Sequence, residues 1–410
     1  MKQSRPWPKF TVTQKAERSL STGHPWIYDS EIASCPNVLP DAGEIVDVLS
    51  HRGSWLGSGF YSPSSKIRIR IITRNSNDIM DTEFWKRRLQ YAWDYRKSVM
   101  NKEDLCCCRI IFGEADSLPG LTVDRFNDVL VAQTLSVGIE RFKNIIFPLL
   151  IKLLREDGQE IRGIYERNDV SLRQREGLLE NKGWYPFDGK SDFGGTSTEI
   201  CENGIFYFVD FENGQKTGFF LDQKYNRKAV ARIAHGKRVL DCFTHTGSFA
   251  LNAAYGGAEH VTAVDVSRSA IDVAQKNAIR NDLDNKIDFI CEDVFELLPK
   301  LESSGDSYNF IILDPPAFTK SRRTAQNALR GYKEINYRAM KLLPRGGYLA
   351  TASCSHFATE EMFRKMLHEA AHDAHRQLRQ IEMRQQALDH PILWNVKETD
   401  YLKFFLFQVI

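Results

Sequence analysis

Residues 239–249 have the sequence Val-Leu-Asp-Cys-Phe-Thr-His-Thr-Gly-Ser-Phe. Apolar residues open this stretch, a polar turn with one glycine follows, and helix-forming residues begin near Ser248. This order predicts a buried strand, a tight turn and a helix, which together form the first βα unit of a nucleotide-binding sheet. Ligands of such sheets bind beyond the carboxyl ends of the strands, so the turn marks a candidate binding site.

The turn offers a single glycine, Gly247. A dinucleotide site typically has the longer pattern Gly-x-Gly-x-x-Gly, because the backbone must approach a pyrophosphate closely. S-adenosylmethionine has no phosphate and needs a close backbone approach for its methionine part. The sparser turn therefore favours S-adenosylmethionine as the cofactor, and a turn that serves only the fold is the alternative.

Acidic residues stand at the ends of further strands. Asp265 ends the run Thr262-Ala-Val-Asp, where its carboxylate can accept hydrogen bonds from both hydroxyls of a ribose. The alternative is that Asp265 only caps a helix that starts at Ser267. Asp293 ends a third strand, where an adenine amino group would lie. A series of such acids supports a nucleoside ligand more strongly than any one of them.

The second half of the chain, residues 193–410, alternates strands with helices and is expected to form a doubly wound, Rossmann-like α/β sheet. The strands are expected at Arg238–Phe243, Val261–Val266, Lys286–Cys291, Phe310–Leu313 and Gly347–Ser353. After the last of these strands, we expect a long helix at Glu360–Arg376 and then a final apolar run at Phe404–Ile410.

The first half differs in pattern. Residues 1–75 contain short strand-like runs between Gly, Pro and Ser turns, which predicts a small β-barrel. Residues 76–192 are expected to form a central α+β module with helices at Asp81–Met100 and near Glu140–Arg155. At 410 residues the chain is too long for one core, which agrees with two or three domains.

Composition excludes several classes of protein. The chain has 55 basic and 53 acidic residues, so it is not a globally basic nucleic-acid binder. No apolar run approaches the roughly 20 residues of a membrane helix, and we expect a soluble cytoplasmic protein. The eight cysteines are scattered and predict neither a disulfide framework nor a metal site.

Two local runs are nevertheless basic. Lys66, Arg68 and Arg70 alternate along one expected strand, and residues 320–345, which include Arg322 and Arg323, contain one acid, Glu334. Such runs can neutralise RNA phosphates, although a solvated helix face is the more frequent cause of any one of them. We expect the arginines to be the RNA contacts.

The fourth strand of the α/β sheet leads into Asp314-Pro-Pro-Ala-Phe318. Paired prolines fix a rigid, extended turn and hold Asp314 at the strand end. Asp-Pro-Pro with a following aromatic residue is typical of methyltransferases that hold a planar base. Asp314 is therefore a candidate catalytic residue, and Pro315 and Phe318 are candidate contacts of the base.

The fifth strand ends in Ala352-Ser-Cys354-Ser-His356, which places a thiol at the same edge. Carbon 5 of a pyrimidine is a poor nucleophile in an intact ring. A thiolate that adds to carbon 6 produces an enamine-like intermediate that can accept a methyl group at carbon 5. Burial of Cys354 as a small apolar residue is the alternative, and Asp-Pro-Pro one strand earlier favours the catalytic role.

At these residues the chain resembles the bacterial large-subunit ribosomal RNA cytosine-5 methyltransferases, which carry an N-terminal PUA domain. The resemblance extends over nearly the whole length. It includes Gly23-His-Pro-Trp-Ile-Tyr28, Gly113-Glu-Ala-Asp-Ser-Leu-Pro-Gly-Leu-Thr-Val-Asp-Arg125 and Gln215-Lys-Thr-Gly-Phe-Phe-Leu-Asp-Gln223.

The resemblance implies a nucleophile, Cys354, and a carboxylate, Asp314, that orients cytosine through its N3 edge. Ala317 and Phe318 stand where many cytosine-5 enzymes have a second cysteine, which leaves the base that removes the carbon-5 proton unassigned; His356 is a candidate. The residues that would form the S-adenosylmethionine site are Gln223, Asp241, Phe243, Thr246, Gly247, Asp265 and Asp293.

The implied partner is RNA, in the first place large-subunit ribosomal RNA, and a homodimer is left open. Two other functions remain. Asp-Pro-Pro with an aromatic residue also serves methylation of a guanine or adenine nitrogen, which needs no thiol. A non-catalytic RNA-binding factor of ribosome assembly is the second, although the intact acid series and Cys354 argue against it.

Overall fold

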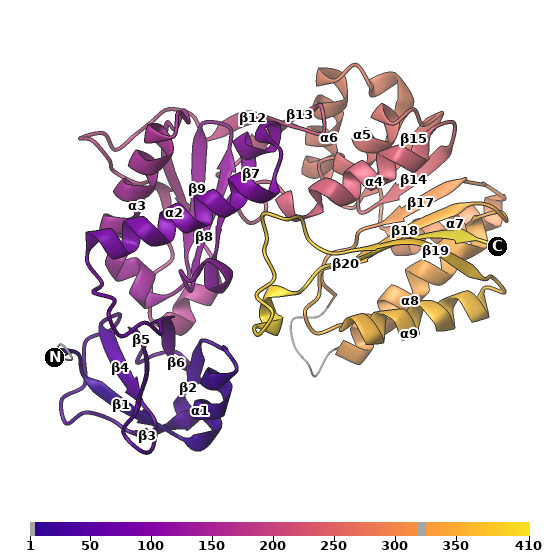
Figure 1. Ribbon diagram of the computed structural model, residues 1–410. Coiled ribbons are helices and arrows are strands. Elements are labelled where there is room, and N and C mark those ends of the chain that lie inside the picture. The colour runs from indigo at the N-terminus through magenta and orange to yellow at the C-terminus, as the bar shows by residue number, and fades with distance from the viewer. Residues whose placement is uncertain (1–4, 319–324) are drawn as a thin grey trace. The chain divides into compact units, whose positions relative to one another are not determined.

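The computed structural model describes residues 5–318 and 325–410, which form two compact units. The first unit comprises Met1–Ile200, Val209–Leu221 and Leu388–Thr399. The second comprises Cys201–Phe208, Asp222–Ala387 and Asp400–Ile410. Figure 1 shows the elements of each unit.

The first unit begins with a six-stranded sheet in the order β2-β6-β5-β4-β1-β3. β1 and β4 are parallel and the other neighbours are antiparallel. Phe10, Val48 and Ile69 lie in the core of this sheet. Its elements are β1 (Lys9–Val12), α1 (Gln14–Ser21), β2 (Trp26–Tyr28), β3 (Ile32–Ser34), β4 (Ile45–Leu49), β5 (Trp55–Tyr61) and β6 (Ile67–Thr73).

A five-stranded sheet follows, in the order β11-β10-β9-β8-β7, with two long helices, α2 (Thr82–Val99) and α3 (Val137–Glu156). Asp81 caps α2 as its side chain accepts from the Phe84 N–H. Ser136 caps α3, which explains why α3 begins before the expected Glu140. The strands are β7 (Cys107–Phe112), β8 (Leu121–Phe126), β9 (Val129–Thr134), β10 (Gly163–Arg167) and β11 (Lys182–Trp184).

The first unit extends to Ile200 and includes two later segments, Val209–Leu221 and Leu388–Thr399. The hairpin of β12 (Ser197–Glu202) and β13 (Ile205–Asp210) contributes to both units. Residues 388–399 return to the first unit, because the Asp389 carboxylate accepts the Arg109 N–H at 2.8 Å and its carbonyl accepts from Arg96 at 2.8 Å. The division into three domains stays a prediction.

The second unit contains a seven-stranded sheet in the order β16-β15-β14-β17-β18-β20-β19. The first five strands are parallel, and β20 is antiparallel to both of its neighbours. The chain leaves β14 toward β15 on one side and returns to β17 on the other, so β14 and β17 flank the switch point where open α/β sheets bind ligands. The strands are β14 (Arg238–Cys242), β15 (His260–Asp265), β16 (Ile287–Cys291), β17 (Phe310–Leu313), β18 (Tyr348–Ser353), β19 (Leu378–Arg384) and β20 (Lys403–Val409).

Helices cover both faces of this sheet, as expected for a doubly wound fold (Figure 1). α4, α5 and α6 lie on one face, and α7, α8 and α9 pack on the other (Figure 1). No helix in the described part of the chain is long and apolar enough to cross a membrane. The bounds are α4 (Lys224–Ala234), α5 (Ser248–Tyr255), α6 (Arg268–Arg280), α7 (Val294–Ser304), α8 (Ala325–Leu342) and α9 (Glu360–Asp373).

Candidate active site

The loop between β14 and α5 has an unusual backbone. Phe243, His245 and Gly247 all have left-handed conformations, with φ of 66°, 51° and 83°. Non-glycine residues rarely adopt this region, and such residues cluster at binding sites that the surrounding structure supports. The left-handed φ of Gly247 favours glycine, and a Cβ there would lie 3.0 Å from the Cβ of Ala274, so Ala274 would have to shift.

Asp241 is a buried acid at this edge of the sheet. It is fully buried, and one carboxylate oxygen, Oδ2, accepts from the Thr244 hydroxyl at 2.5 Å and from the Ala250 N–H at 2.9 Å. The other oxygen, Oδ1, is buried and has no hydrogen-bond partner among the described residues. Burial, assisted by the negative charges of Asp314 and Asp265, raises the pKa of Asp241 to about 7.

Asp265 and Asp293 both bind local backbone groups. The two oxygens of Asp265 accept the N–H groups of His245 and Ser267, each at 2.9 Å. Asp265 thus holds the β14–α5 loop, while Ser267 is the N-cap of α6. Asp293 is exposed and caps α7 by accepting from the Phe295 N–H at 2.8 Å. Each carboxylate oxygen can accept a further hydrogen bond, so these contacts leave room for a ligand.

The groups of this edge fit S-adenosylmethionine. The unsatisfied oxygen of Asp241 suits a cationic group, because a buried carboxylate without a partner is costly. The Thr246 hydroxyl is also buried and without a partner among the described residues, so it too can bind a polar ligand atom. The loop around Gly247 provides the close backbone approach.

Asp314 follows β17, the strand next to β14, and is held by a residue expected elsewhere in the site. Gln223 donates from Nε2 to Asp314 at 2.9 Å, and its carbonyl oxygen accepts from Asn226 at 2.6 Å. Both groups of the Gln223 amide are therefore used. The structure places Gln223 against the Asp314 carboxylate, and the direct contact of Gln223 with the cofactor stays a prediction.

Phe318 lies in an aromatic cluster beyond the paired prolines. Its ring centroid is 4.7 Å from that of Tyr332, 5.8 Å from Phe295 and 6.4 Å from Phe243. Pro315 is buried and Phe318 is half-buried. Burial raises the pKa of Tyr332, and the charges of Cys354 and Asp314 both contribute to that increase. The charges of Cys354 and Asp314 therefore act on the same hydroxyl.

Cys354 follows β18 and is half-buried. Leu313 of β17 pairs with Thr351 of β18, which brings the two strand ends to one edge. Sequence reasoning missed two neighbours, Tyr332 and Lys403, because their positions follow from helix packing and from an antiparallel strand.

The basic residues expected to contact RNA have different surroundings. Arg70 is buried, and its guanidinium binds both carboxylate oxygens of Glu176, at 2.7 and 3.1 Å. Its expected role as a phosphate contact is corrected here, because its charge is neutralised inside the first unit. Arg68 pairs with the exposed Asp29 at 2.7 Å. Arg322 and Arg323 lie outside the described residues.

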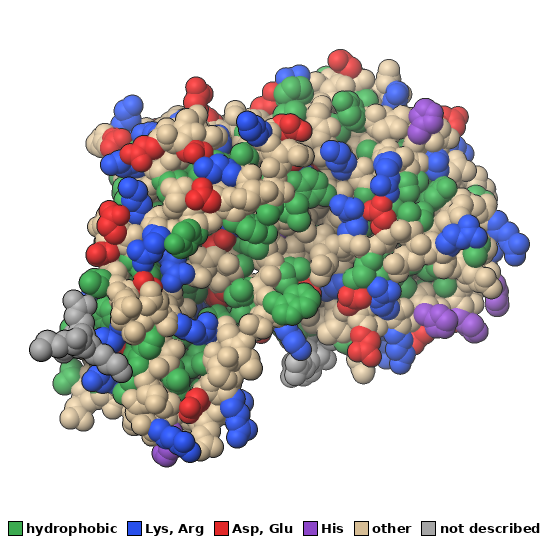
Figure 2. Space-filling model, in the orientation of Figure 1, with side chains coloured by type: hydrophobic (Ala, Val, Ile, Leu, Met, Phe, Trp, Pro, Cys, Tyr) green, Lys and Arg blue, Asp and Glu red, His purple; other side chains and the backbone are tan. Residues whose placement is uncertain are grey.

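The surface charge is mixed. On the face in Figure 2, basic side chains are interspersed with acidic ones and do not form one continuous stripe. No group of three or more His, Cys, Asp or Glu residues within the described ranges is arranged to hold a metal ion.

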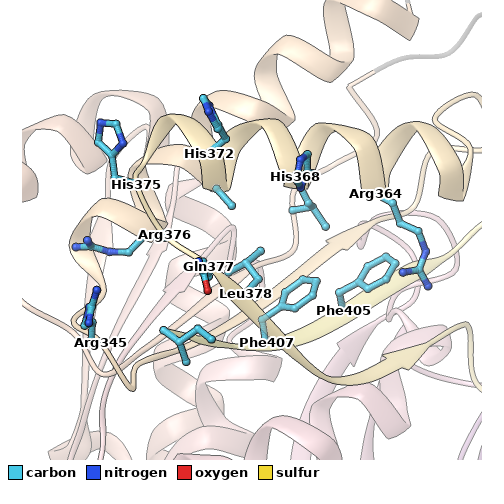
Figure 3. A pocket seen from close by; sticks show the side chains of 13 residues that line it. Arg345, Arg364, His368, His372, His375, Arg376, Gln377, Leu378, Phe405 and Phe407 are labelled. Atoms are coloured by element: carbon cyan, nitrogen blue, oxygen red, sulfur yellow. The ribbon is translucent and has the colours of Figure 1, made fainter.

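A cavity of about 850 Å³ lies between α9 and the strands β19 and β20, lined by Arg345, His368, His375, Arg376 and Phe407 among others (Figure 3). Arg345 precedes β18 and His375 follows α9, so this cavity lies toward the amino ends of the parallel strands. It is separate from the acids and the thiol.

Two family models match this chain. The model of the S-adenosylmethionine-dependent methyltransferase family matches residues 191–408, and that of the PUA-like domain matches residues 10–74. Proteins named ribosomal RNA large subunit methyltransferase I are 40% identical in Klebsiella pneumoniae strain 342 and 39% identical in Escherichia coli, over 98% of this chain and 99% of each relative.

A solved structure from Streptococcus mutans, described as a candidate SAM-dependent methyltransferase, superposes with a TM-score of 0.81 at 22% identity. It covers 98% of this chain and 99% of that one. A second structure with the same values is a candidate methyltransferase complexed with SAH. At this identity the likeness shows the fold. From its relatives and its domain matches, the chain belongs to the family of S-adenosylmethionine-dependent methyltransferases that carry a PUA-like domain and are named ribosomal RNA large subunit methyltransferase I.

Proposed function

We propose that this protein methylates carbon 5 of a cytidine in large-subunit ribosomal RNA through a covalent bond to Cys354. The relatives' shared name supports the RNA substrate. The observation that carries the proposal is that Cys354, a half-buried residue, follows β18 at the edge of the sheet where Asp314 follows the neighbouring β17. Such a substrate would place the enzyme in the cytoplasm, where ribosomes are assembled.

The cofactor site in this proposal is the edge formed by β14, β15 and β16. Asp241 and Thr246 provide the two unsatisfied buried oxygens, Gly247 the close backbone approach, and Asp265 and Asp293 the strand-end carboxylates. Phe243 closes the site on the side of Phe318. When bound, S-adenosylmethionine supplies an electrophilic methyl group on a sulfonium.

The residues of the neighbouring edge act on the base. A target cytidine must leave its stack to reach the thiol, and the aromatic cluster of Phe318 offers a surface for it. Asp314, held by Gln223, orients the ring through N3. Cys354 adds to carbon 6, which raises the electron density at carbon 5. After methylation a base, for which His356 is the candidate, takes the carbon-5 proton. The electrons of that C–H bond re-form the carbon 5–6 double bond, and the carbon–sulfur bond breaks to release the thiolate of Cys354.

Methylation of a base nitrogen is the competing function, and it makes a different product. Unmodified large-subunit ribosomal RNA is incubated with the enzyme and S-adenosylmethionine, and its nucleosides are analysed by mass spectrometry. We expect 5-methylcytidine from the wild type and from Cys201→Ala, which removes an exposed thiol, and none from Cys354→Ala. Methylguanosine or methyladenosine as the product, or full activity of Cys354→Ala, would contradict the proposal.

A further inference from the structure

Lys403 is a buried lysine beside β18, the strand that Cys354 follows. It is the first residue of β20 and pairs across the sheet with Ser353, the last residue of β18. Only 5% of Lys403 is exposed. Lysine is almost never fully buried without a partner, so its position here needs an explanation.

The ammonium of Lys403 binds two carbonyl groups. It donates to Ser355 at 2.6 Å and to Tyr401 at 2.9 Å. Ser355 directly follows Cys354, so the first of these bonds fixes the backbone that carries the thiol. Lys403 forms no ion pair within the part of the chain that the structure describes, and carbonyl oxygens leave its charge unneutralised.

The acids whose charges act on Lys403 are engaged with other residues. Glu360 pairs with Arg364 at 2.6 Å, and Asp400 accepts from Gln385 at 3.1 Å. Among the charged groups that affect the pKa of Lys403, Cys354 has the largest effect, followed by Asp400 and Glu360. Burial lowers the pKa of Lys403 to about 8. A thiolate at Cys354 is the negative charge that this ammonium is best placed to meet.

We propose that Lys403 is a positioning residue whose ammonium stabilises the thiolate of Cys354 and fixes the backbone of its loop. The inference rests on the proposed function, because the thiolate is the nucleophile of that reaction. A thiol attacks only as the thiolate, and a nearby cation increases the thiolate fraction at a given pH. The negative charges of Asp400 and Glu360 also act on Lys403 and oppose this effect. Asp314, whose charge acts on Tyr332 together with that of Cys354, is a further negative charge on this side, and Tyr332 stays neutral because its pKa is raised.

The test measures the thiol directly and does not require RNA. The full chain is alkylated with iodoacetamide between pH 6 and 10, and the rate at each cysteine is read by peptide mass spectrometry. Lys403→Gln retains N–H donors without the charge, Lys403→Met removes both, and Lys403→Arg retains the charge. Exposed Cys35 is the reference thiol, and fully buried Cys242 reacts only if the sheet opens.

We expect the midpoint of the Cys354 profile to move up by about one pH unit in Lys403→Gln and to stay near the wild-type value in Lys403→Arg, while Cys35 does not change. If Cys242 becomes reactive in Lys403→Gln, the sheet of that variant has opened, and Lys403→Met is then the neutral variant that is compared with the wild type. An unchanged midpoint in a folded neutral variant overturns the inference. Equal shifts in the neutral and the Arg variants also overturn it, because they would show a packing role.

This result is independent of the reaction product. If the wild type methylates a nitrogen while the neutral variants still shift the Cys354 midpoint, the proposed function fails and the role of Lys403 stands. If 5-methylcytidine forms while the midpoint is unchanged, the proposed function stands and Lys403 has no such role.

Discussion

From the raised pKa of Asp241 we predict that the affinity for S-adenosylmethionine rises with pH. Its pKa of about 7 means that the carboxyl is largely protonated at pH 6, whereas a cationic ligand group at Oδ1 favours the carboxylate. The ionised fraction rises from about one-eleventh at pH 6 to about three-quarters at pH 7.5. The affinity for S-adenosylmethionine should therefore increase about eightfold over this range, or about 1.2 kcal/mol.

In the absence of ligand, the raised pKa of Asp241 should make the folded protein less stable as the pH rises. Between about pH 4 and pH 7 the folded protein holds a proton on Asp241 that the unfolded chain has released. The free energy of unfolding should therefore fall as the pH rises through this window.

Calorimetric titration of S-adenosylmethionine at several pH values measures the affinity. Asp241→Asn can still accept from Thr244 and Ala250 with its amide oxygen, so it removes the charge and keeps the local contacts. Its affinity should be lower at pH 7.5 and independent of pH. Asp282→Asn, an exposed acid of the same unit, should behave as the wild type. A wild-type affinity that does not change with pH, or a pH dependence that survives Asp241→Asn, would refute the reasoning.

Three further changes test other parts of the molecule. Asp265→Ala should weaken S-adenosylmethionine binding by about 1.5–3 kcal/mol in calorimetry, and unchanged affinity would show that Asp265 only holds the backbone. Arg70→Met should lower the free energy of unfolding, measured in urea, by about 3–5 kcal/mol, because it leaves the buried carboxylate of Glu176 without its partner. The control Arg68→Met should lower it by less than about 1 kcal/mol. Similar values for the two variants would contradict this prediction. If Arg322 and Arg323 contact phosphates, replacing each by Ala should reduce the slope of log affinity against log salt for RNA by about 0.7–0.9, and an unchanged slope would exclude such contacts.

The sequence predicted the parallel strands and their end residues well. Buried parallel strands are continuous apolar runs in the sequence, and a turn such as that at Gly247 can adopt few backbone conformations. β19 was not predicted, because Leu378–Arg384 is a largely polar edge strand with no continuous apolar run.

The environment of single side chains could not be predicted in the same way. Arg70 alternates with apolar residues as a surface arginine would, but Glu176, more than 100 residues later, neutralises it. Lys403 and Gln223 reach Cys354 and Asp314 only through tertiary contacts. Local pattern identifies the edge of the sheet, and long-range pairing decides which groups meet there.

Trapping the covalent intermediate tests the central claim most directly. RNA with 5-fluorocytidine at the target cannot lose fluorine as a cation, so elimination of the thiolate stalls after methylation. We predict a protein–RNA adduct that survives denaturation, requires S-adenosylmethionine, and is absent in Cys354→Ala. If the wild type methylates ordinary RNA and forms no adduct with the fluorinated RNA, methylation at carbon 5 through Cys354 is contradicted.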